Sequence, residues 1–338
     1  MSLVRLIAAL AIVLAASVAL AEPIDVWFDV DTANGVVKQR PRDVDDGLAL
    51  IFAFHSPELK IRGVSVVFGN ADLVDAAPVA REIVNRFGPK DLEVQTGAAS
   101  ANELGDETAA SKALIGELER RPLTILALGP VTNVATVLKN RPDLAPKINQ
   151  IIVCAARRPG FGFYLPGNPS VVFPDANFEK DAAGMQILLD SGVQIVFAGY
   201  EVSCDTWISR HDLSAIATTS DAGKWISETS QAWLERWEKS RGPKGFNPFD
   251  TLCVAYLTHP GMIETMPATA HITTGPDDRA GTGVPATRPT KPYLIAEPPV
   301  EKSARPHIYC TAAKVEFHDV LIQRLAEAAS NLEEKKMR

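Results

Sequence analysis

The chain carries two acidic stretches close together near its N-terminus, IDVWFDVD at residues 24–31 and DVDDGLALIFAF at residues 43–54. The first is rich in β-branched and aromatic residues and predicts a strand over Ile24 to Val30. In the second, apolar residues recur at helical spacing from Leu48 to Phe54 and predict a helix. The loop between strand and helix would then gather the carboxylates, which are Asp29, Asp31, Asp43, Asp45 and Asp46. Crowded carboxylates repel one another unless protons or a cation compensate, so a hard metal ion is the first hypothesis.

Short apolar runs alternate with amphipathic stretches along most of the remaining chain. The apolar runs cover 61–68, 123–128, 150–155 and 193–198, and the amphipathic stretches cover 75–87, 104–120 and 131–139. This alternation predicts an α/β fold with a mostly parallel sheet and covering helices. The Pro-rich region 267–306 is expected to form a long excursion near the edge of the sheet. Residues 315–325 are expected to form a closing helix.

The first 21 residues have the features of a cleavable signal peptide. Arg5 precedes an apolar core from Leu6 to Ala16, and Ala19-Leu-Ala21 has the small-x-small pattern of a cleavage site. We therefore expect an exported protein, periplasmic or secreted. No stable membrane anchor is expected, because the apolar core is short and no cysteine follows the cleavage site.

Charge and metal-ligand spacing argue against two other classes of protein. The formal net charge is −7 at pH 7, which disfavours nucleic acid as a partner. The four cysteines form no CxxC pair and the six histidines show no HxxxH or HExxH spacing, so the sequence disfavours a zinc site. Cys154 and Cys253 lie in apolar surroundings and are interpreted as small buried hydrophobic residues.

Polar residues follow the ends of several predicted strands. Asp31 follows the first, Gly69-Asn70 the second and Leu128-Gly-Pro130 a third, and Cys154 precedes a glycine-rich, aromatic loop. In an open parallel sheet, ligands bind at the carboxyl ends of the strands. The sequence therefore predicts one site to which several strand ends contribute. Asn133 follows the third of these turns and is interpreted as a helix cap.

At these positions the sequence resembles the calcium-dependent nucleoside hydrolases. Asp29-Val-Asp31 followed by Asp45-Asp46-Gly-Leu-Ala-Leu is similar to their opening motif, DxDxGxDDxxAL. The stretches GVSVVFGN at 63–70 and LGPVTNVA at 128–135 resemble their second strand and their LGPLTNIA segment. Further matches at 167–168, 177–183 and 249–256 extend the resemblance over roughly residues 24 to 260.

The resemblance implies a Rossmann-like nucleoside hydrolase fold, with residues 22–338 forming a single catalytic domain. It implies hydrolysis of the N-glycosidic bond of ribonucleosides by a water bound to one Ca²⁺, with Asp31 as the base that takes the proton. The implied calcium ligands are Asp31, Asp46, the carbonyl of Leu128 and Asp250. A small-molecule nucleoside is the implied partner, and a homo-oligomer, either a dimer or a tetramer, is left open.

The resemblance also implies how a riboside would be held. Asp45, Asn70 and Asn177 would bind the ribose diol and its neighbourhood, and Asn168 and Asp175 would lie toward the 5′-hydroxyl. Trp233 and Trp237, one helical turn apart, would stack on the base, although an i, i+4 tryptophan pair also fits core packing.

The sequence departs from the family pattern in three places. Phe249 stands where many relatives have a histidine that donates a proton to the leaving base, so acid assistance is missing at that position. Thirteen residues separate Asp31 from Asp45 where the motif has three. This longer loop either bulges outward and leaves Asp31 as the base, or brings Asp43 into that role. Asp175 replaces the usual glutamate, which shortens the arm toward the 5′-hydroxyl.

Two other functional classes fit parts of the sequence. The stretch FDVDT at 28–32 matches the DxDxT start of haloacid-dehalogenase-type phosphatases. This interpretation leaves four residues without a role, namely Asn70, Asn168, Asn177 and Asp250. An exported protein that binds ribosides without cleaving them is compatible with Phe249 and the altered loop. Retention of the full carboxylate set argues for an enzyme.

Overall fold

The computed structural model describes residues 22–165, 168–279, 289–299 and 306–330. The expected signal peptide at 1–21 lies outside these described residues. Within them, none of the helices combines the length and the apolar character needed to cross a membrane.

The described strands build one nine-stranded sheet in the order β12-β11-β13-β10-β7-β6-β1-β4-β5. Neighbouring strands from β13 to β5 pair in parallel, and only the pairings of β11 with β13 and with β12 are antiparallel. The predicted mostly parallel α/β sheet is confirmed. The strands are β1 (Ile24–Val30), β4 (Leu59–Val66), β5 (Val94–Thr96), β6 (Leu123–Ala127), β7 (Ile148–Val153), β10 (Ile195–Phe197), β11 (Ile263–Pro276), β12 (Thr290–Glu297) and β13 (His307–Ala313).

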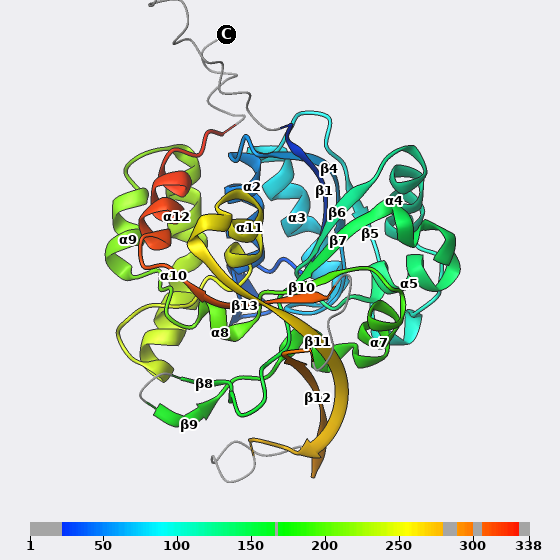
Figure 1. Cartoon of the computed structure of the whole chain (residues 1–338). Coiled ribbons are helices and arrows are strands. Elements are labelled where there is room, and N and C mark those ends of the chain that lie inside the picture. The colour runs from blue at the N-terminus through cyan, green and yellow to red at the C-terminus, as the bar shows by residue number, and fades with distance from the viewer. Residues whose placement is uncertain (1–21, 166–167, 280–288, 300–305, 331–338) are drawn as a thin grey trace, which may run out of the picture.

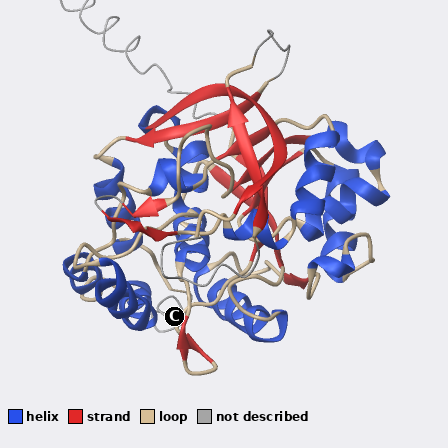
Figure 2. Cartoon of the chain, turned by 90° about the horizontal axis from the view of Figure 1, so that it is seen from below, coloured by secondary structure: helices blue, strands red, loops and turns tan. Residues whose placement is uncertain are grey.

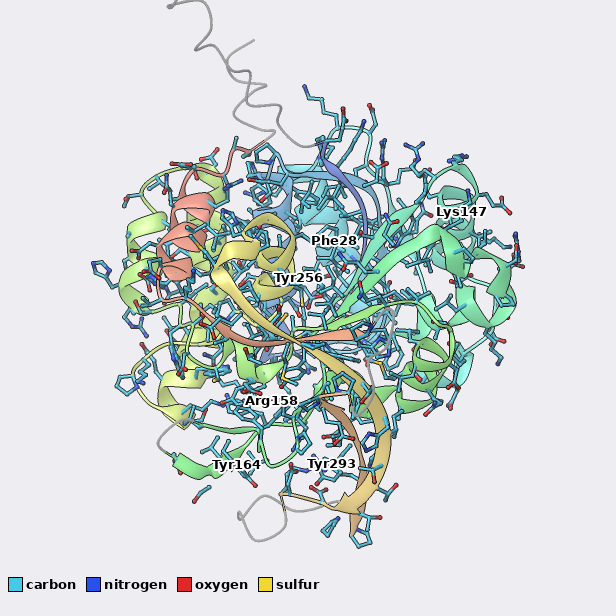
Figure 3. The ribbon with its side chains drawn as sticks, viewed as in Figure 1. Phe28, Lys147, Arg158, Tyr164, Tyr256 and Tyr293 are labelled. Atoms are coloured by element: carbon cyan, nitrogen blue, oxygen red, sulfur yellow. The ribbon has the colours of Figure 1, made fainter. Side chains whose placement is uncertain are left out.

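Helices cover both faces of this sheet, as Figures 1 and 2 show. The two faces have separate apolar cores, and β1 contributes to both because successive side chains of a strand point to opposite faces. Phe28, which lies in the middle of the molecule in Figure 3, packs into the core of α2 and α3, whereas Trp27 packs into that of α4, α5 and α7. The helices are α2 (Asp45–Phe54), α3 (Leu73–Phe87), α4 (Ala109–Arg120), α5 (Thr132–Asn140), α6 (Ala176–Lys180), α7 (Ala182–Asp190), α8 (Tyr200–Ser203), α9 (Arg210–Ile216), α10 (Asp221–Arg241), α11 (Thr251–Thr258) and α12 (Phe317–Ala326).

The Pro-rich region lies at the edge of the sheet, as predicted, but it contains strands rather than only an excursion. β11 pairs with β13 through its first half, from Ile263 to Ala268, and with β12 through its second half. Among the described residues, each half therefore pairs with a strand on one side only, and a proline that lacks an N–H is tolerated on the other side.

The extra segment between Asp31 and Asp45 folds into a hairpin of β2 (Val36–Val37) and β3 (Arg40–Pro41). Lys38 at its tip pairs with Asp72 at 2.5 Å and with Asp75 at 2.9 Å, which ties the hairpin to the start of α3. On its other side, Arg236 of α10 donates a hydrogen bond to the carbonyl of Pro41 at 3.3 Å.

Candidate active site

Residues at the carboxyl ends of several parallel strands line one cavity of about 230 Å³. The residues that follow β4, β6 and β7 reach its wall, and the loop before α2, the helices α6, α8 and α10, and the turn before α11 complete it. Most of the predicted site residues line this cavity, namely Asp45, Asn70, Leu128, Asp175, Asn177, Trp233, Trp237 and Asp250.

Asp31 and Asp46 lie beneath Asn70, away from the cavity wall. The Asn70 backbone N–H donates to Oδ2 of Asp31 at 2.7 Å, and its side-chain amide donates to Oδ1 at 3.0 Å. The same amide reaches Oδ2 of Asp46 at 3.3 Å, while the Asp31 N–H donates to Oδ1 of Asp46 at 2.9 Å. Asn70, predicted as a ribose contact, therefore also fixes the orientation of both carboxylates.

Three carboxylates, two consecutive and one about 200 residues later, form a cluster beside the cavity. Asp45, Asp46 and Asp250 each offer an oxygen, and these oxygens all lie within 4.8 Å of one another. Asp45 and Asp46 form the first turn of α2, not the loop on which the sequence placed them, because the helix begins earlier than its apolar pattern. Asp250 immediately precedes α11. Asp31 stands outside this trio but is hydrogen-bonded to Asp46.

The electrostatics of this trio are unfavourable without a cation. Burial raises the pKa of Asp45 and of Asp250 well above the ordinary range, and the negative charge of their neighbours raises each pKa further. Burial and the charge of Asp31 do the same to the pKa of Asp46. The Oδ1 atom of Asp250 is buried without a hydrogen-bond partner in the described part of the chain. This set of oxygen donors, with an unsatisfied oxygen among them, fits a hard divalent cation.

The carbonyl of Leu128 also faces the cavity and is already in contact with Asn177. The Asn177 side-chain amide donates to this carbonyl at 2.5 Å and to the carbonyl of Cys154 at 3.3 Å. Asn177 lies on α6, so this helix is fixed to the ends of β6 and β7 at the predicted site.

The hydrogen bonds that hold the Asp29 side chain were not predicted from the sequence. Asp29 is fully buried, and its Oδ1 accepts hydrogen bonds from Ser65 at 2.6 Å and from Asn133 at 2.8 Å. Burial raises the pKa of Asp29 to about 6. The interpretation of Asn133 as a helix cap is wrong, because Asn133 is the second residue of α5 and its Oδ1 accepts from the Ala98 N–H instead. No local pattern in the sequence marks this long-range role.

The two residues predicted to lie toward the 5′-hydroxyl have different surroundings. Asp175 is buried at the cavity wall, its Oδ2 accepts from the Ala156 N–H at 3.0 Å, and burial raises its pKa to about 7. Asn168 is exposed on β9 (Asn168–Val172), where its Oδ1 accepts from the Ser170 N–H. It lies outside the cavity lining.

Aromatic side chains that contact one another form part of the cavity wall. The Trp237 ring lies 5.6 Å from the Phe173 ring, 6.0 Å from the Phe249 ring and 6.1 Å from the Trp233 ring, measured between centroids. Both tryptophans line the cavity and both are more than nine-tenths buried, so they pack in the core as well as border the cavity. Phe249 belongs to this wall and offers no proton.

Two charged residues at the cavity lie outside the predicted site set. Asp43, weighed as an alternative base, lines the cavity directly, and burial raises its pKa to about 6. Arg241, the last residue of α10, also lines it. The signal for Arg241 was its position, four residues after Trp237 and eight after Trp233, which places all three on one helix face.

Comparison with known proteins agrees with this geometry. A family model described as inosine-uridine preferring nucleoside hydrolase matches residues 26–301. Uridine nucleosidase 1 of Arabidopsis thaliana is 27% identical over 249 residues, which cover 65% of this chain and 72% of that protein. The pyrimidine-specific ribonucleoside hydrolase RihA of Citrobacter koseri is 25% identical over 66% of this chain and 78% of its own length. The solved structure of a purine-preferring ribonucleoside hydrolase from Gardnerella vaginalis superimposes with a TM-score of 0.70 at 20% identity, covering 89% of this chain and 98% of that one.

Proposed function

Because the chain belongs to the inosine-uridine preferring nucleoside hydrolase family, we propose that it hydrolyses the N-glycosidic bond of ribonucleosides to ribose and free base. The observation that carries this proposal is the mixed lining of the cavity. Buried carboxylates and aromatic rings border the same space, with Asp45 and Asp250 among the former and Trp233, Trp237 and Phe249 among the latter. Such a cavity suits a ligand with a hydroxyl-rich end and a flat, apolar end.

We propose Ca²⁺ as the cation at this site. Asp31, Asp46, the Leu128 carbonyl and Asp250 would hold it, and Asp45 lies close enough to contribute. When bound, the ion supplies Lewis acidity and a template for the sugar hydroxyls. The choice of calcium rests on a donor set that consists only of oxygens and on the absence of thiol or imidazole groups from the described cluster.

The carboxylates of the chain serve the reaction in two ways. Bond cleavage places positive charge on the sugar, and a fixed array of buried carboxylates stabilises that charge more strongly than water does. Asp31 would accept the proton of the attacking water, and the hydrogen bonds from Asn70 keep both of its oxygens oriented. Asp43 is the alternative base, and its direct exposure to the cavity is the observation that favours it.

The remaining polar residues would orient the sugar, and the aromatic wall would hold the base. Asp45, Asn70 and Asn177 would bind the diol, with Asp175 toward the 5′-hydroxyl. Trp233 and Trp237 would contact the base by stacking or by their ring edges. We further propose that the protein is exported, on the basis of the signal-peptide pattern in residues 1–21.

The test is base release from a panel of purine and pyrimidine ribosides, measured with and without a chelator. Purified protein should contain about one equivalent of calcium, and chelation should abolish base release until calcium is returned. A calcium-loaded protein that binds ribosides without releasing base would instead be a riboside-binding protein. Hydrolysis of p-nitrophenyl phosphate but not of ribosides would support the phosphatase class.

A further inference from the structure

Arg241 is a cation on the cavity wall that none of the described acidic residues neutralises through an ion pair. Its guanidinium carbon lies 4.3 Å from the centre of the Trp237 ring and 4.8 Å from the centre of the Phe173 ring. Its Nε atom is buried and has no hydrogen-bond partner among the described residues. By contrast, Arg157, which stacks on Phe163 nearby, pairs with Asp278 at 2.8 Å. Arg241 is therefore held in place by aromatic rings and retains donors for a ligand.

Two further N–H donors on the same face of α10 are also unsatisfied. Trp233, Trp237 and Arg241 follow at intervals of four residues, and all three line the cavity. The indole Nε1 atoms of both tryptophans are buried without a partner in the described part of the chain. A buried donor left without an acceptor costs about 1–3 kcal/mol. These three nitrogen donors therefore have no acceptor among the described residues.

A nucleoside has groups that suit both the carboxylates and these donors. Its hydroxyls face carboxylates, and its base carries carbonyl oxygens and ring nitrogens that accept hydrogen bonds. When the C1′–N bond breaks, its electron pair leaves with the base nitrogen, so the base becomes negatively charged while C1′ becomes positive. Phe249 has no proton to give to this anion. A fixed cation beside the base would stabilise the anion without proton transfer.

We propose that Arg241 contacts the departing base and neutralises the negative charge that develops on it. This inference rests on the proposed function and adds to it the group that assists departure of the base. Arginine keeps its proton at any pH at which the protein folds, so it acts as a hydrogen-bond donor and not as an acid. The base therefore leaves as an anion and takes its proton from water afterwards, while a carboxylate of the chain receives the proton of the attacking water.

Arg236 provides a matched control for Arg241. Both belong to α10 and both stack on a tryptophan, Arg236 on Trp233 at 5.4 Å. Arg236 is exposed, donates to the carbonyl of Pro41 and is absent from the cavity wall. Its replacement by methionine removes a cation–π contact from the same helix without removing a donor from the cavity.

The experiment compares two substrates that differ in their need for assistance. Arg241→Met should lower kcat/KM for uridine by about 100-fold or more, the usual effect of removing a donor to developing charge. The loss for p-nitrophenyl riboside, whose leaving group departs unaided, should be less than about fivefold. Arg241→Lys should give an intermediate loss, because it keeps the charge but not the planar fork. Arg236→Met should change neither substrate by more than about twofold. Equal losses on both substrates, or no loss, would overturn the inference.

A binding measurement separates this inference from the proposed function. Tryptophan fluorescence should report a uridine affinity that falls about tenfold in Arg241→Met, while the affinity for ribose stays unchanged. If the unmodified protein cleaves no riboside, the proposed function fails, and unequal effects on uridine and ribose still show that Arg241 contacts the base. Equal effects on both ligands would assign Arg241 to packing. If Arg241→Met does not fold, Arg241→Lys supplies the same comparison.

Discussion

Replacing Gly69 by alanine should displace Asp31 without removing any polar group from the site. Gly69 lies in the turn after β4, and a Cβ atom added to it would stand 1.7 Å from Oδ2 of Asp31 and 2.6 Å from its Cγ. An ordinary van der Waals contact begins at 3.4 Å, so the two groups would have to separate by about 1.7 Å. Asp31 is fully buried and is held at both oxygens by Asn70, so it cannot move without losing those hydrogen bonds.

The size of the expected loss follows from this displacement. A misplacement of about 1 Å in a catalytic group costs about 100-fold in rate, and each tenfold loss corresponds to about 1.4 kcal/mol of transition-state stabilisation. Gly69→Ala should therefore lower kcat/KM for uridine or inosine by at least about 100-fold, or about 2.7 kcal/mol. The assay is base release, together with the thermal midpoint to verify folding.

The control for this variant is Gly116→Ala on α4. A Cβ atom at Gly116 would meet nothing within 4 Å, and alanine is favoured over glycine in a helix by about 1 kcal/mol. This control should keep full activity and gain slightly in stability. A Gly69→Ala protein that folds normally and retains its kcat/KM would refute the assignment of Asp31 as the base and favour Asp43.

Three further outcomes are expected. Asp31→Asn should abolish base release while preserving riboside binding, because an amide cannot accept the proton of the water. Asp43→Asn should change base release little, and the reverse result would make Asp43 the base. Asp250→Asn should reduce the calcium content found by elemental analysis, and an unchanged content would exclude Asp250 as a ligand. It should also reduce the stabilisation of the fold by added calcium, which for the unmodified protein is about 2.7 kcal/mol at a calcium concentration of 100 times Kd. Burial lowers the pKa of His318, but hydrogen bonds to Asp319 and Asp212 outweigh burial and raise it. The stabilisation of the fold by protonated His318 is thus complete below the unfolded pKa of about 6.5 and is lost as pH rises through the folded pKa. In urea unfolding, His318→Gln should lower the free energy of unfolding by less than about 0.5 kcal/mol at about pH 5.5 and leave it unchanged at about pH 8.5. Equal losses at both pH values would contradict this.

The central sheet could be predicted from the sequence because its strands are buried on both faces and are therefore continuously apolar. The predicted boundaries differ where a local contact overrides the pattern. The amphipathic stretch expected from residue 104 becomes helical only at Ala109, because Thr108 and Ser111 form a capping box at that point. Residues 101–103 form a separate 3₁₀ turn.

The carboxylate side of the site was also largely predictable. Asp31, Asn70 and Leu128 follow strands that are adjacent and parallel, so their positions in the sequence imply their meeting in space. The hydrogen bond from Asn133 to Asp29 could not be predicted in this way, since 104 residues separate the pair and the local pattern around each residue does not indicate its partner. Arg241 was missed for a different reason, because an arginine at a helix end usually serves to stabilise the helix dipole.

Two departures from the family pattern that are unrelated in the sequence meet at the aromatic side of the cavity. The inserted hairpin is tied to α3 through Lys38 and to α10 through Arg236, and its last strand is followed by Asp43 at the cavity wall. The negative charge of Asp43 acts on Arg241, which borders the same cavity as Phe249. A lone buried cation beside aromatic rings would be costly, and a carboxylate near it lowers that cost without consuming its donors. The longer loop and Phe249 are then two parts of one arrangement, in which the departing base would meet a fixed positive charge and not a proton donor.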